Sequence, residues 1–355
     1  MRVPPKKHLL KLNRVVNESL VRNEFLRMDK NENLEGFSQE VVQEIREIIT
    51  SEFLTAYPEV DSLYKKLAEC LNVEQKQIYL TAGSDAGIKS VFEVYVEPGD
   101  EVVIIHPTYA MYYVYSKMFQ ARLVEVAFNE DLTLSPERII ENISPATKLI
   151  CIPNPNSPTG TILSVKDLEN IVAVSSKNGS LILIDEAYHQ FWGHSFVDRT
   201  KAFDNLIVTR TFSKALGLAS ARLGYIVSNL DIISSLHRVR PMYEVNAFAV
   251  GLGLYLLHHP HLVAGYVETV AQARKWIEGE LSKYGFNAAP GYANFILIDV
   301  GGRERAKKIE KELFKEKIVI KGGFSDPCLK PYIRVGLGTL EQMKIFLEKF
   351  CKIVG

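Results

Sequence analysis

Short apolar runs alternate with helical patterns through the middle of the chain. The runs are Ile78–Leu80, Glu101–Ile105, Arg122–Val126, Lys148–Ile152, Ser180–Ile184, Leu206–Val208 and Gly224–Val227. Helical patterns fall between several of them, at 137–143 and 166–176 among others. Strands buried on both faces are continuously apolar, so the alternation predicts an α/β fold with a mostly parallel seven-stranded sheet covered by helices. Ligands of such sheets bind beyond the carboxyl ends of the strands.

The two ends of the chain carry other patterns. Residues 6–27 mix apolar and charged positions and predict an N-terminal arm, which includes Val15 and Val16. Ser38 then begins a helical pattern, up to Ile49, as a good N-cap. The other expected elements are helices at 62–71, 249–257, 266–284, 304–314 and 340–352 and strands at 294–298 and 331–335. We therefore expect a large domain at residues 53–265 and a small α+β domain at residues 1–52 and 266–355.

Composition narrows the classes of function. The 42 basic residues balance 42 acidic ones, which argues against a nucleic-acid partner or an anionic membrane surface. The longest run of glycine and apolar residues, 247–257, is too short to span a bilayer. The four cysteines are scattered and the chain start lacks the apolar core of a signal peptide, so we expect a cytoplasmic enzyme. His258, His259 and His261 have no acidic or cysteine companions at ligand spacing, so we expect no metal site.

Lys214 lies among small hydroxyl residues just after the run Leu206–Val208. A lone lysine in a loop is normally a solvated charge. Here Thr211, Ser213 and Arg222 are the donor types that bind a dianionic phosphate. A lysine beside a bound phosphate and a second cation can have its pKa lowered enough to act as a nucleophile. Such an amine forms imines with carbonyl compounds.

The segment Val208–Tyr225 resembles the Schiff-base lysine segment of pyridoxal-phosphate aminotransferases of fold type I, and is most similar to their histidinol-phosphate aminotransferase branch. Seven further motifs fall in the family's order and cover nearly the whole chain: Met28–Asn33, Tyr57–Glu59, Ala82–Asp85, His106–Tyr112, Asn154–Gly160, Asp185–Tyr188 and Tyr332–Val335. The resemblance implies a fold type I transferase with pyridoxal 5′-phosphate as cofactor and Lys214 as the catalytic residue.

The resemblance also implies which residues hold the cofactor. Asp185 ends an apolar strand and would bind the ring nitrogen, although an aspartate there can simply begin a turn. Tyr188 would donate to the phenolic oxygen, or be a core tyrosine. The run Gly83, Ser84 and Asp85 lies between a strand and a helical pattern, so its backbone N–H groups can bind phosphate. Without the other motifs, this run would be read as a loop.

Two tyrosines extend the cofactor site. Tyr109 resembles the residue that stacks on the cofactor ring, whereas Tyr112, Tyr113 and Tyr115 are interpreted as core. Tyr57 resembles the tyrosine that reaches the cofactor phosphate of the neighbouring subunit. The resemblance therefore implies a homodimer as the active form.

Substrate binding is expected on the small-domain side. Arg334 interrupts an apolar strand and matches the family's arginine for a substrate carboxylate or phosphate. The alternative is a salt bridge across the domain boundary. The motif Met28–Asn33 places Asn33 among the substrate-binding residues as well.

Three positions depart from the family pattern. Ser157 stands where the family usually has an asparagine that donates to the cofactor, and the neighbouring Asn156 could compensate. Lys321 stands where histidinol-phosphate aminotransferases commonly have a second arginine, and a lysine lacks the bidentate fork. These enzymes also use a tyrosine of the N-terminal arm, but the first tyrosine here is Tyr57. We therefore expect histidinol phosphate to be a poor substrate.

The expected reaction is transamination between glutamate and a small phosphorylated or carboxylated amino or keto compound. A phospho-amino-acid decarboxylase similar to threonine-phosphate decarboxylase shares the motifs, and only the orientation of the bond that breaks separates the two. A non-enzymatic regulatory domain that binds the cofactor is disfavoured, because the chain has no appended helix-turn-helix segment.

Overall fold

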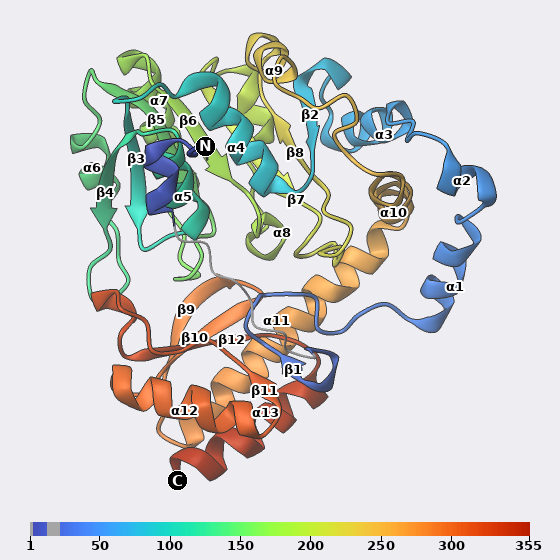
Figure 1. Cartoon of the computed structure of the whole chain (residues 1–355). Helices are drawn as coiled ribbons and strands as arrows, with labels where there is room; N and C mark the ends of the chain where they lie inside the picture. Colours follow the sequence, from blue (N-terminus) through green and yellow to red (C-terminus); the bar gives the residue numbers. More distant parts are fainter. Residues whose placement is uncertain (1–2, 13–21) are drawn as a thin grey trace.

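The computed structural model describes residues 3–12 and 22–355, so Val15 and Val16 of the predicted arm lie outside the described residues. The chain forms a large body around a seven-stranded sheet and a small body around a three-stranded sheet (Figure 1). The chain passes from the large body into the small one along the helix α11, Pro260–Lys283.

The large sheet confirms the predicted α/β architecture. Its strands lie in the order β2-β8-β7-β6-β5-β3-β4, and β8 runs antiparallel to both of its neighbours. The neighbouring pairs from β7 to β4 are parallel. The bounds are β2 Ile78–Thr81, β3 Glu101–His106, β4 Arg122–Ala127, β5 Thr147–Pro153, β6 Leu181–Asp185, β7 Leu206–Thr211 and β8 Gly224–Val227.

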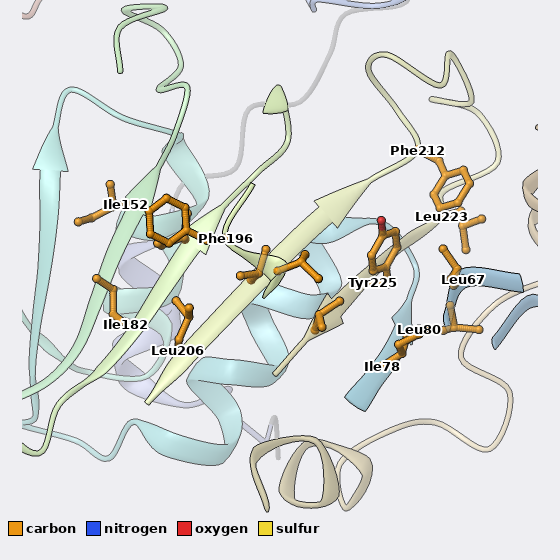
Figure 2. Packing of buried hydrophobic residues seen from close by; sticks show 14 of the residues in the cluster. Leu67, Ile78, Leu80, Ile152, Ile182, Phe196, Leu206, Phe212, Leu223 and Tyr225 are labelled. Atoms are coloured by element: carbon orange, nitrogen blue, oxygen red, sulfur yellow. The ribbon is translucent and has the colours of Figure 1, made fainter. Parts of the chain in front are cut away.

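Helices cover both faces of this sheet because its strands are apolar on both sides. Ile182 and Ile184 of β6 face one core, which also contains residues of α3, α6, α7 and α10, whereas Leu183 faces a second core with α4, α5 and α9. Figure 2 shows part of the first core. The helix bounds are α3 Asp61–Leu71, α4 Ser84–Tyr95, α5 Ala110–Met118, α6 Pro136–Glu141, α7 Val165–Asn178, α8 His189–Trp192, α9 Leu230–His237 and α10 Ala247–His258.

The small body has its own core. Its antiparallel sheet has the order β12-β10-β9, and a parallel pair joins β1 to β11. Apolar residues of α11, α12, α13, β10 and β12 pack together there. The bounds are β1 Leu26–Arg27, β9 Ala288–Ala293, β10 Phe295–Asp299, β11 Ile318–Val319, β12 Tyr332–Gly336, α12 Arg303–Lys315 and α13 Leu340–Val354.

The predicted helix after Ser38 is two helices. The Ser38 hydroxyl accepts the Val41 N–H at 3.3 Å and begins α1, Gln39–Glu47. Thr50 then accepts the Phe53 N–H at 3.1 Å and begins α2, Ser51–Thr55. The second cap explains the break, because an N-cap residue has extended rather than helical backbone. Both helices lie on the outer side of α10 (Figure 1). The short 3₁₀ helices are η1 Lys7–Lys11, η2 Arg22–Glu24, η3 Gln75–Gln77, η4 Val197–Lys201 and η5 Pro327–Leu329.

Membrane-spanning potential is low among the described residues. No single helix there is long and apolar enough to cross a bilayer. The pair α10 and α11 passes by length and composition together, but the two helices meet at an 80° bend.

The parallel register brings strand ends together at one edge of the large sheet. Pro153 of β5 is paired with Asp185 of β6, and Asp185 with Thr209 of β7. The segments that follow these strands therefore leave the sheet side by side, on the side that faces the small body (Figure 1).

Candidate active site

A cavity of about 580 Å³ lies between these strand ends and the small body. Most of the predicted site residues line it: Ser84, Asp85, Tyr109, Ser157, Asp185, Tyr188, Thr211, Ser213, Lys214, Arg222, Lys321 and Arg334. Asp29, Lys30, Asn31, Thr108 and Phe324 line it as well. The structure thus brings together side chains that are up to 305 positions apart in the sequence, as for Asp29 and Arg334.

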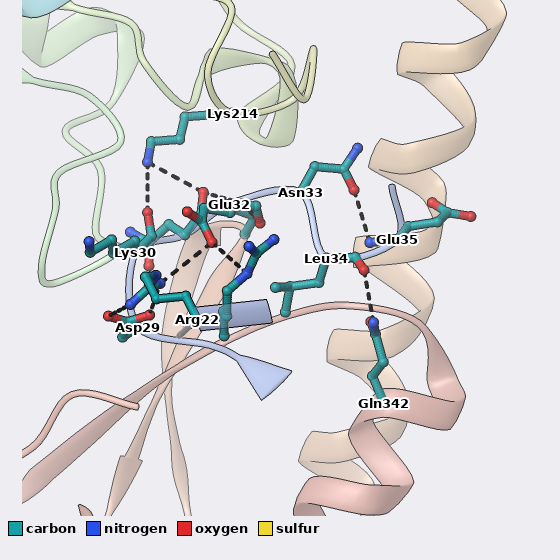
Figure 3. A network of polar contacts seen from close by, with 12 residues as sticks. Arg22, Asp29, Lys30, Glu32, Asn33, Leu34, Glu35, Lys214 and Gln342 are labelled. Carbon is teal, nitrogen blue, oxygen red and sulfur yellow. Dashed lines mark hydrogen bonds and ion pairs between the residues drawn. The ribbon is translucent and has the colours of Figure 1, made fainter. Parts of the chain in front are cut away.

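Lys214 connects the large body to the N-terminal segment. It lies in the loop after β7, and its Nζ donates to the carbonyl oxygen of Lys30 at 2.9 Å and of Asn31 at 3.3 Å (Figure 3). Its Nζ also lies 5.7 Å from the centre of the Tyr188 ring. The amine is therefore held inside the cavity by neutral acceptors rather than by a carboxylate.

A cluster of hydrogen-bond donors lies at the start of α4. Gly83 precedes the helix with a φ of 82°, and a Cβ atom there would lie 2.6 Å from a terminal nitrogen of Arg222. The Arg222 guanidinium thus lies directly against the Gly83 backbone, and it donates to Ser213 Oγ at 3.3 Å. The N–H of Ser213 in turn donates to the Thr211 hydroxyl at 3.1 Å. Free N–H groups at a helix N-terminus beside an arginine form an anion site.

Asp185 is a buried carboxylate with two neutral donors. Its Oδ2 accepts the Tyr112 hydroxyl at 3.1 Å and its Oδ1 accepts the Ala187 N–H at 3.0 Å. Burial raises the pKa of Asp185 to about 6, although both hydrogen bonds act in the opposite direction. A positively charged N–H in the cavity would lower this pKa, because opposite charges favour the ionised form.

Two tyrosines border the space in front of Asp185. The Tyr188 hydroxyl oxygen accepts Asn31 Nδ2–H at 2.9 Å, which leaves its own O–H to donate elsewhere. Tyr109 precedes α5, and burial raises the pKa of its phenol, which therefore stays neutral. Its ring packs edge-on against Tyr112.

Arg334 enters the cavity from β12. It donates to the carbonyl oxygen of Asp29 at 2.7 Å and to Ser157 Oγ at 3.5 Å. Its Nε is buried and has no hydrogen-bond partner among the described residues. Both hydrogen-bond partners of Arg334 are neutral, a carbonyl and a hydroxyl. Among the described residues, Arg334 therefore does not form the interdomain salt bridge that was the alternative. Lys321, paired with Arg334 through the backbone, extends an exposed amine at the same wall.

Three predicted site residues lie elsewhere. Asn33 does not line the cavity, because its side-chain oxygen accepts the N–H groups of Glu35 and Gly36 and closes a turn. Tyr57 is 73% exposed and stacks on Tyr243, with 4.2 Å between ring centroids. Gly83 lies behind the cavity wall, against Arg222.

Asn156 is not free to compensate for Ser157. Its amide nitrogen donates to the Pro107 carbonyl and the Thr159 hydroxyl, and its oxygen accepts from Thr108. The amide is buried and both of its N–H groups are used within the fold.

Sequence reasoning missed two contacts. Tyr112 was interpreted as core, and it is buried, but it also donates to Asp185. The sequence analysis gave Asn31 no role of its own within its motif. In the structure, Asn31 donates a hydrogen bond to Tyr188 and accepts one from Lys214. A signal for Asn31 exists, because asparagine is among the few residues that tolerate its positive φ of 56°.

The comparisons with known proteins identify the class. Residues 23–350 match the family described as Aminotransferase class I and II, and the chain belongs to this family. It is a pyridoxal-phosphate-dependent aminotransferase with the fold type I architecture. It is 34% identical to the histidinol-phosphate aminotransferase of Caldanaerobacter subterraneus subsp. tengcongensis over 88% of each chain. It is 30% identical to histidinol-phosphate aminotransferase 1 of Carboxydothermus hydrogenoformans over 93% of each.

Solved structures agree in fold. The histidinol-phosphate aminotransferase of Sinorhizobium meliloti in complex with pyridoxal-5′-phosphate superposes with a TM-score of 0.88 at 22% identity, over 100% of this chain and 98% of that one. A mutant aspartate aminotransferase of Thermus thermophilus gives 0.82 at 20% identity, over 99% and 100%.

The residues of the cavity fit this cofactor. The start of α4 with Ser213 and Arg222 matches a dianionic phosphate in donor type and charge. Asp185, with its raised pKa and its two neutral donors, matches a protonated ring nitrogen. Tyr188 retains an O–H for the phenolic oxygen.

The raised pKa of Asp185 predicts a pH-dependent stability for the cofactor-free protein. The pKa of Asp185 is 3.8 in the unfolded chain and about 6 in the folded state. The folded state therefore loses stability as the pH rises from 3.8 to about 6, and the full cost of the buried charge is present above pH 6. At pH 8, Asp185→Asn should therefore increase the free energy of unfolding by an amount on the order of 2 kcal/mol and raise the melting temperature. Both gains should shrink towards pH 4. Thermal unfolding at several pH values measures the difference.

The control is Asp198→Asn, which changes an exposed carboxylate and should leave the melting temperature unchanged. A gain at Asp185 that stays constant from pH 4 to pH 8 would contradict the shifted pKa.

Proposed function

We propose that this enzyme transfers an amino group between glutamate and a small amino or keto compound that carries one carboxylate or phosphate. The observation that carries this proposal is Arg334, which faces the cavity that contains Lys214 and whose buried Nε has no hydrogen-bond partner among the described residues. A guanidinium with a free N–H can bind an oxyanion at fixed orientation.

The chain's residues divide the work of the cofactor site. The cofactor phosphate would bind at the start of α4, to Ser84, Ser213 and Arg222, and Thr211 would hold Ser213. Because Gly83 has no side chain, the Arg222 guanidinium can approach this helix end closely. Asp185 would hold the proton of the ring nitrogen, and Tyr112 would keep this carboxylate oriented. Tyr188 would donate to the phenolic oxygen, and Tyr109 would cover the ring. Bound pyridoxal phosphate supplies the electron sink for negative charge at the substrate α-carbon.

Lys214 would move the proton of the substrate α-carbon. Its amine reaches neutral carbonyl acceptors in the cavity, so it can turn from them to the substrate without breaking an ion pair. A positioned amine that accepts and returns this proton acts as general base and general acid in turn.

The reaction type can be tested by its products. With 2-oxoglutarate as acceptor, the purified enzyme and an amino substrate should form glutamate and a keto product without release of carbon dioxide. Lys214→Ala should lower the rate by at least about 10²- to 10⁴-fold, the usual contribution of a positioned proton carrier. Lys177→Ala, on the exposed face of α7, is the matched control and should leave the rate unchanged. Stoichiometric carbon dioxide would instead favour the decarboxylase.

Substrate choice depends on Arg334 and Lys321. Histidinol phosphate is the first compound to test, because several relatives carry its name. Lys321 offers an exposed point charge in place of an arginine fork, and Asn33 lies in its own turn. We therefore expect kcat/KM for histidinol phosphate to be low and to rise about 10- to 100-fold in Lys321→Arg, the value of one charge-assisted hydrogen bond.

The measurement compares histidinol phosphate, aromatic amino acids and small phosphorylated amines on both proteins. Efficient use of histidinol phosphate by the wild type, without improvement by the arginine, would show that Lys321 is an adequate anchor.

We infer a cytoplasmic homodimer in which Tyr57 serves the partner's cofactor phosphate. Tyr57 lies outside its own cavity and stacks on Tyr243, which lines a surface pocket together with Leu54 and Phe248; all four side chains are exposed. Exposed apolar patches of this kind mark protein interfaces. The four cysteines are free thiols, as expected in a reducing compartment.

Subunit mixing tests the role of Tyr57. Inactive Tyr57→Phe and Lys214→Ala proteins should recover activity when their subunits exchange, because each mixed dimer then has one intact site. Exchange is followed with two affinity tags. Mixed dimers that form but stay inactive would place Tyr57 outside the partner's site.

A further inference from the structure

One imidazole joins the two bodies beside the cavity. His106 is the last residue of β3, and its Nε2 lies 3.2 Å from Oδ1 of Asp326, which belongs to the small body. On the other side of the ring, Nδ1 lies 2.8 Å from Glu125 Oε2 and 2.6 Å from the Tyr113 hydroxyl. Both of these partners belong to the large body. Neither His106 nor Asp326 lines the cavity.

We propose that His106 is a positioning residue, which fixes the small-body segment 321–326 against the large sheet and so sets the wall of the cavity. Thr108 and Tyr109, two and three positions after His106, line the cavity. Lys321 and Phe324, which precede Asp326, line it too. The contact between His106 and Asp326 therefore joins two segments that border the cavity.

The other side of the imidazole is held within the large body. The Tyr113 hydroxyl is hydrogen-bonded to Nδ1 at 2.6 Å, and the Glu125 carboxylate lies 2.8 Å from the same nitrogen. The hydrogen bond with Tyr113 fixes the ring, and so the direction in which Nε2 points. The Asp326 carboxylate of the small body therefore meets an imidazole that the large body orients.

The contacts next to Asp326 are mostly apolar. They involve Leu132, Cys328 and Leu329, with Phe128 and Phe324 packed against them. Apolar burial is non-directional, so it orients the segment less closely than a contact between two polar groups does. Elsewhere the bodies also meet through the hydrogen bond from Arg334 to Ser157 Oγ. The side chain of Asp326 makes no capping hydrogen bond to η5, so its contact with His106 is not a by-product of the local turn.

The expected effect is on substrate binding rather than on the chemical step. This expectation rests on the proposed function, in which Lys321 contacts the substrate. A looser wall would weaken ground-state and transition-state binding alike, which raises KM and leaves kcat almost unchanged. The loss of one partly exposed ion-pair contact corresponds to a rise in KM of up to roughly fivefold.

Two measurements on the cofactor-loaded enzyme test the proposal. Amide hydrogen exchange measures the exchange rates of the segment 318–330 without any substrate. Steady-state kinetics measure KM and kcat for the best amino substrate. In Asp326→Ala, exchange in this segment and KM should both rise, with kcat within about twofold of wild type. Asp326→Asn keeps the acceptor oxygen and should restore both values. His106→Ala combined with Asp326→Ala should be no worse than Asp326→Ala alone.

Glu125→Ala is the matched control, because it removes a carboxylate from the same imidazole but leaves the contact with Asp326. It should leave exchange at 318–330 unchanged. Equal effects of Glu125→Ala and Asp326→Ala, or unchanged exchange in Asp326→Ala, would overturn the proposal. Hydrogen exchange needs no turnover, so it tests the positioning role independently of the proposed function. If the substrate or the reaction type were wrong, the enzyme would show no activity, but exchange at 318–330 would still rise in Asp326→Ala.

Discussion

The backbone carbonyls of Met28 to Leu34 are the acceptors around which the active site is arranged. This segment has no regular secondary structure, so its carbonyls need partners from elsewhere. The donors come from both bodies and include Gly336, Arg334, Lys214, Asn294 and Gln342. Figure 3 shows the contacts of Lys214 and Gln342 with this segment. Lys214 and Arg334 are thus oriented by neighbouring peptide groups of one short segment. The distance between Lys214 and Arg334 is therefore set by this segment of the chain.

Neutral partners recur throughout this site. Lys214 and Arg334 bind carbonyl oxygens, and Asp185 binds a hydroxyl and an N–H. A buried charge with neutral partners is costly, as the raised pKa of Asp185 indicates. A zwitterionic ligand with a phosphate would bring opposite charges to this cavity and would so offset the cost of these charges. Glu186 shows the contrast one position along, where a full ion pair with Arg210 is buried in the fold.

Sequence patterns predicted the frame of this molecule better than its details. Most strands of the large sheet contain a continuous apolar run, and the alternation of these runs with helical patterns predicted the fold class without any knowledge of pairing. The strand β9 was missed, because its sequence, Ala288 to Ala293, contains no β-branched residue and is held by pairing with β10. The break between α1 and α2 was missed because the apolar spacing continues through Ile49 and the second cap, Thr50, is a single residue.

For the site, the family motifs predicted Lys214, Asp185 and Arg222, and the structure places all three at one cavity. The contact between Tyr112 and Asp185 joins residues 73 positions apart, and helical periodicity reports only that Tyr112 is buried. Asn33 was predicted to bind the substrate because of its motif. In the structure, its amide oxygen closes a turn, and Asn31 lines the cavity instead. The position in the chain alone does not distinguish these two asparagines.

The close approach of β8 to the start of α4 has a consequence for the order of folding. A Cβ atom at Gly224 would lie 2.4 Å from the Ser84 nitrogen, so the start of α4 takes its final shape only against β8. The strand β2, which precedes α4, pairs with β8, and these are the first and the last strands of the large sheet in the sequence. Contacts of such high sequence separation close a long loop, so we expect them to form late. We therefore expect the donors at the start of α4 to assemble only after the sheet has closed, so that a bound cofactor would stabilise the finished fold by mass action.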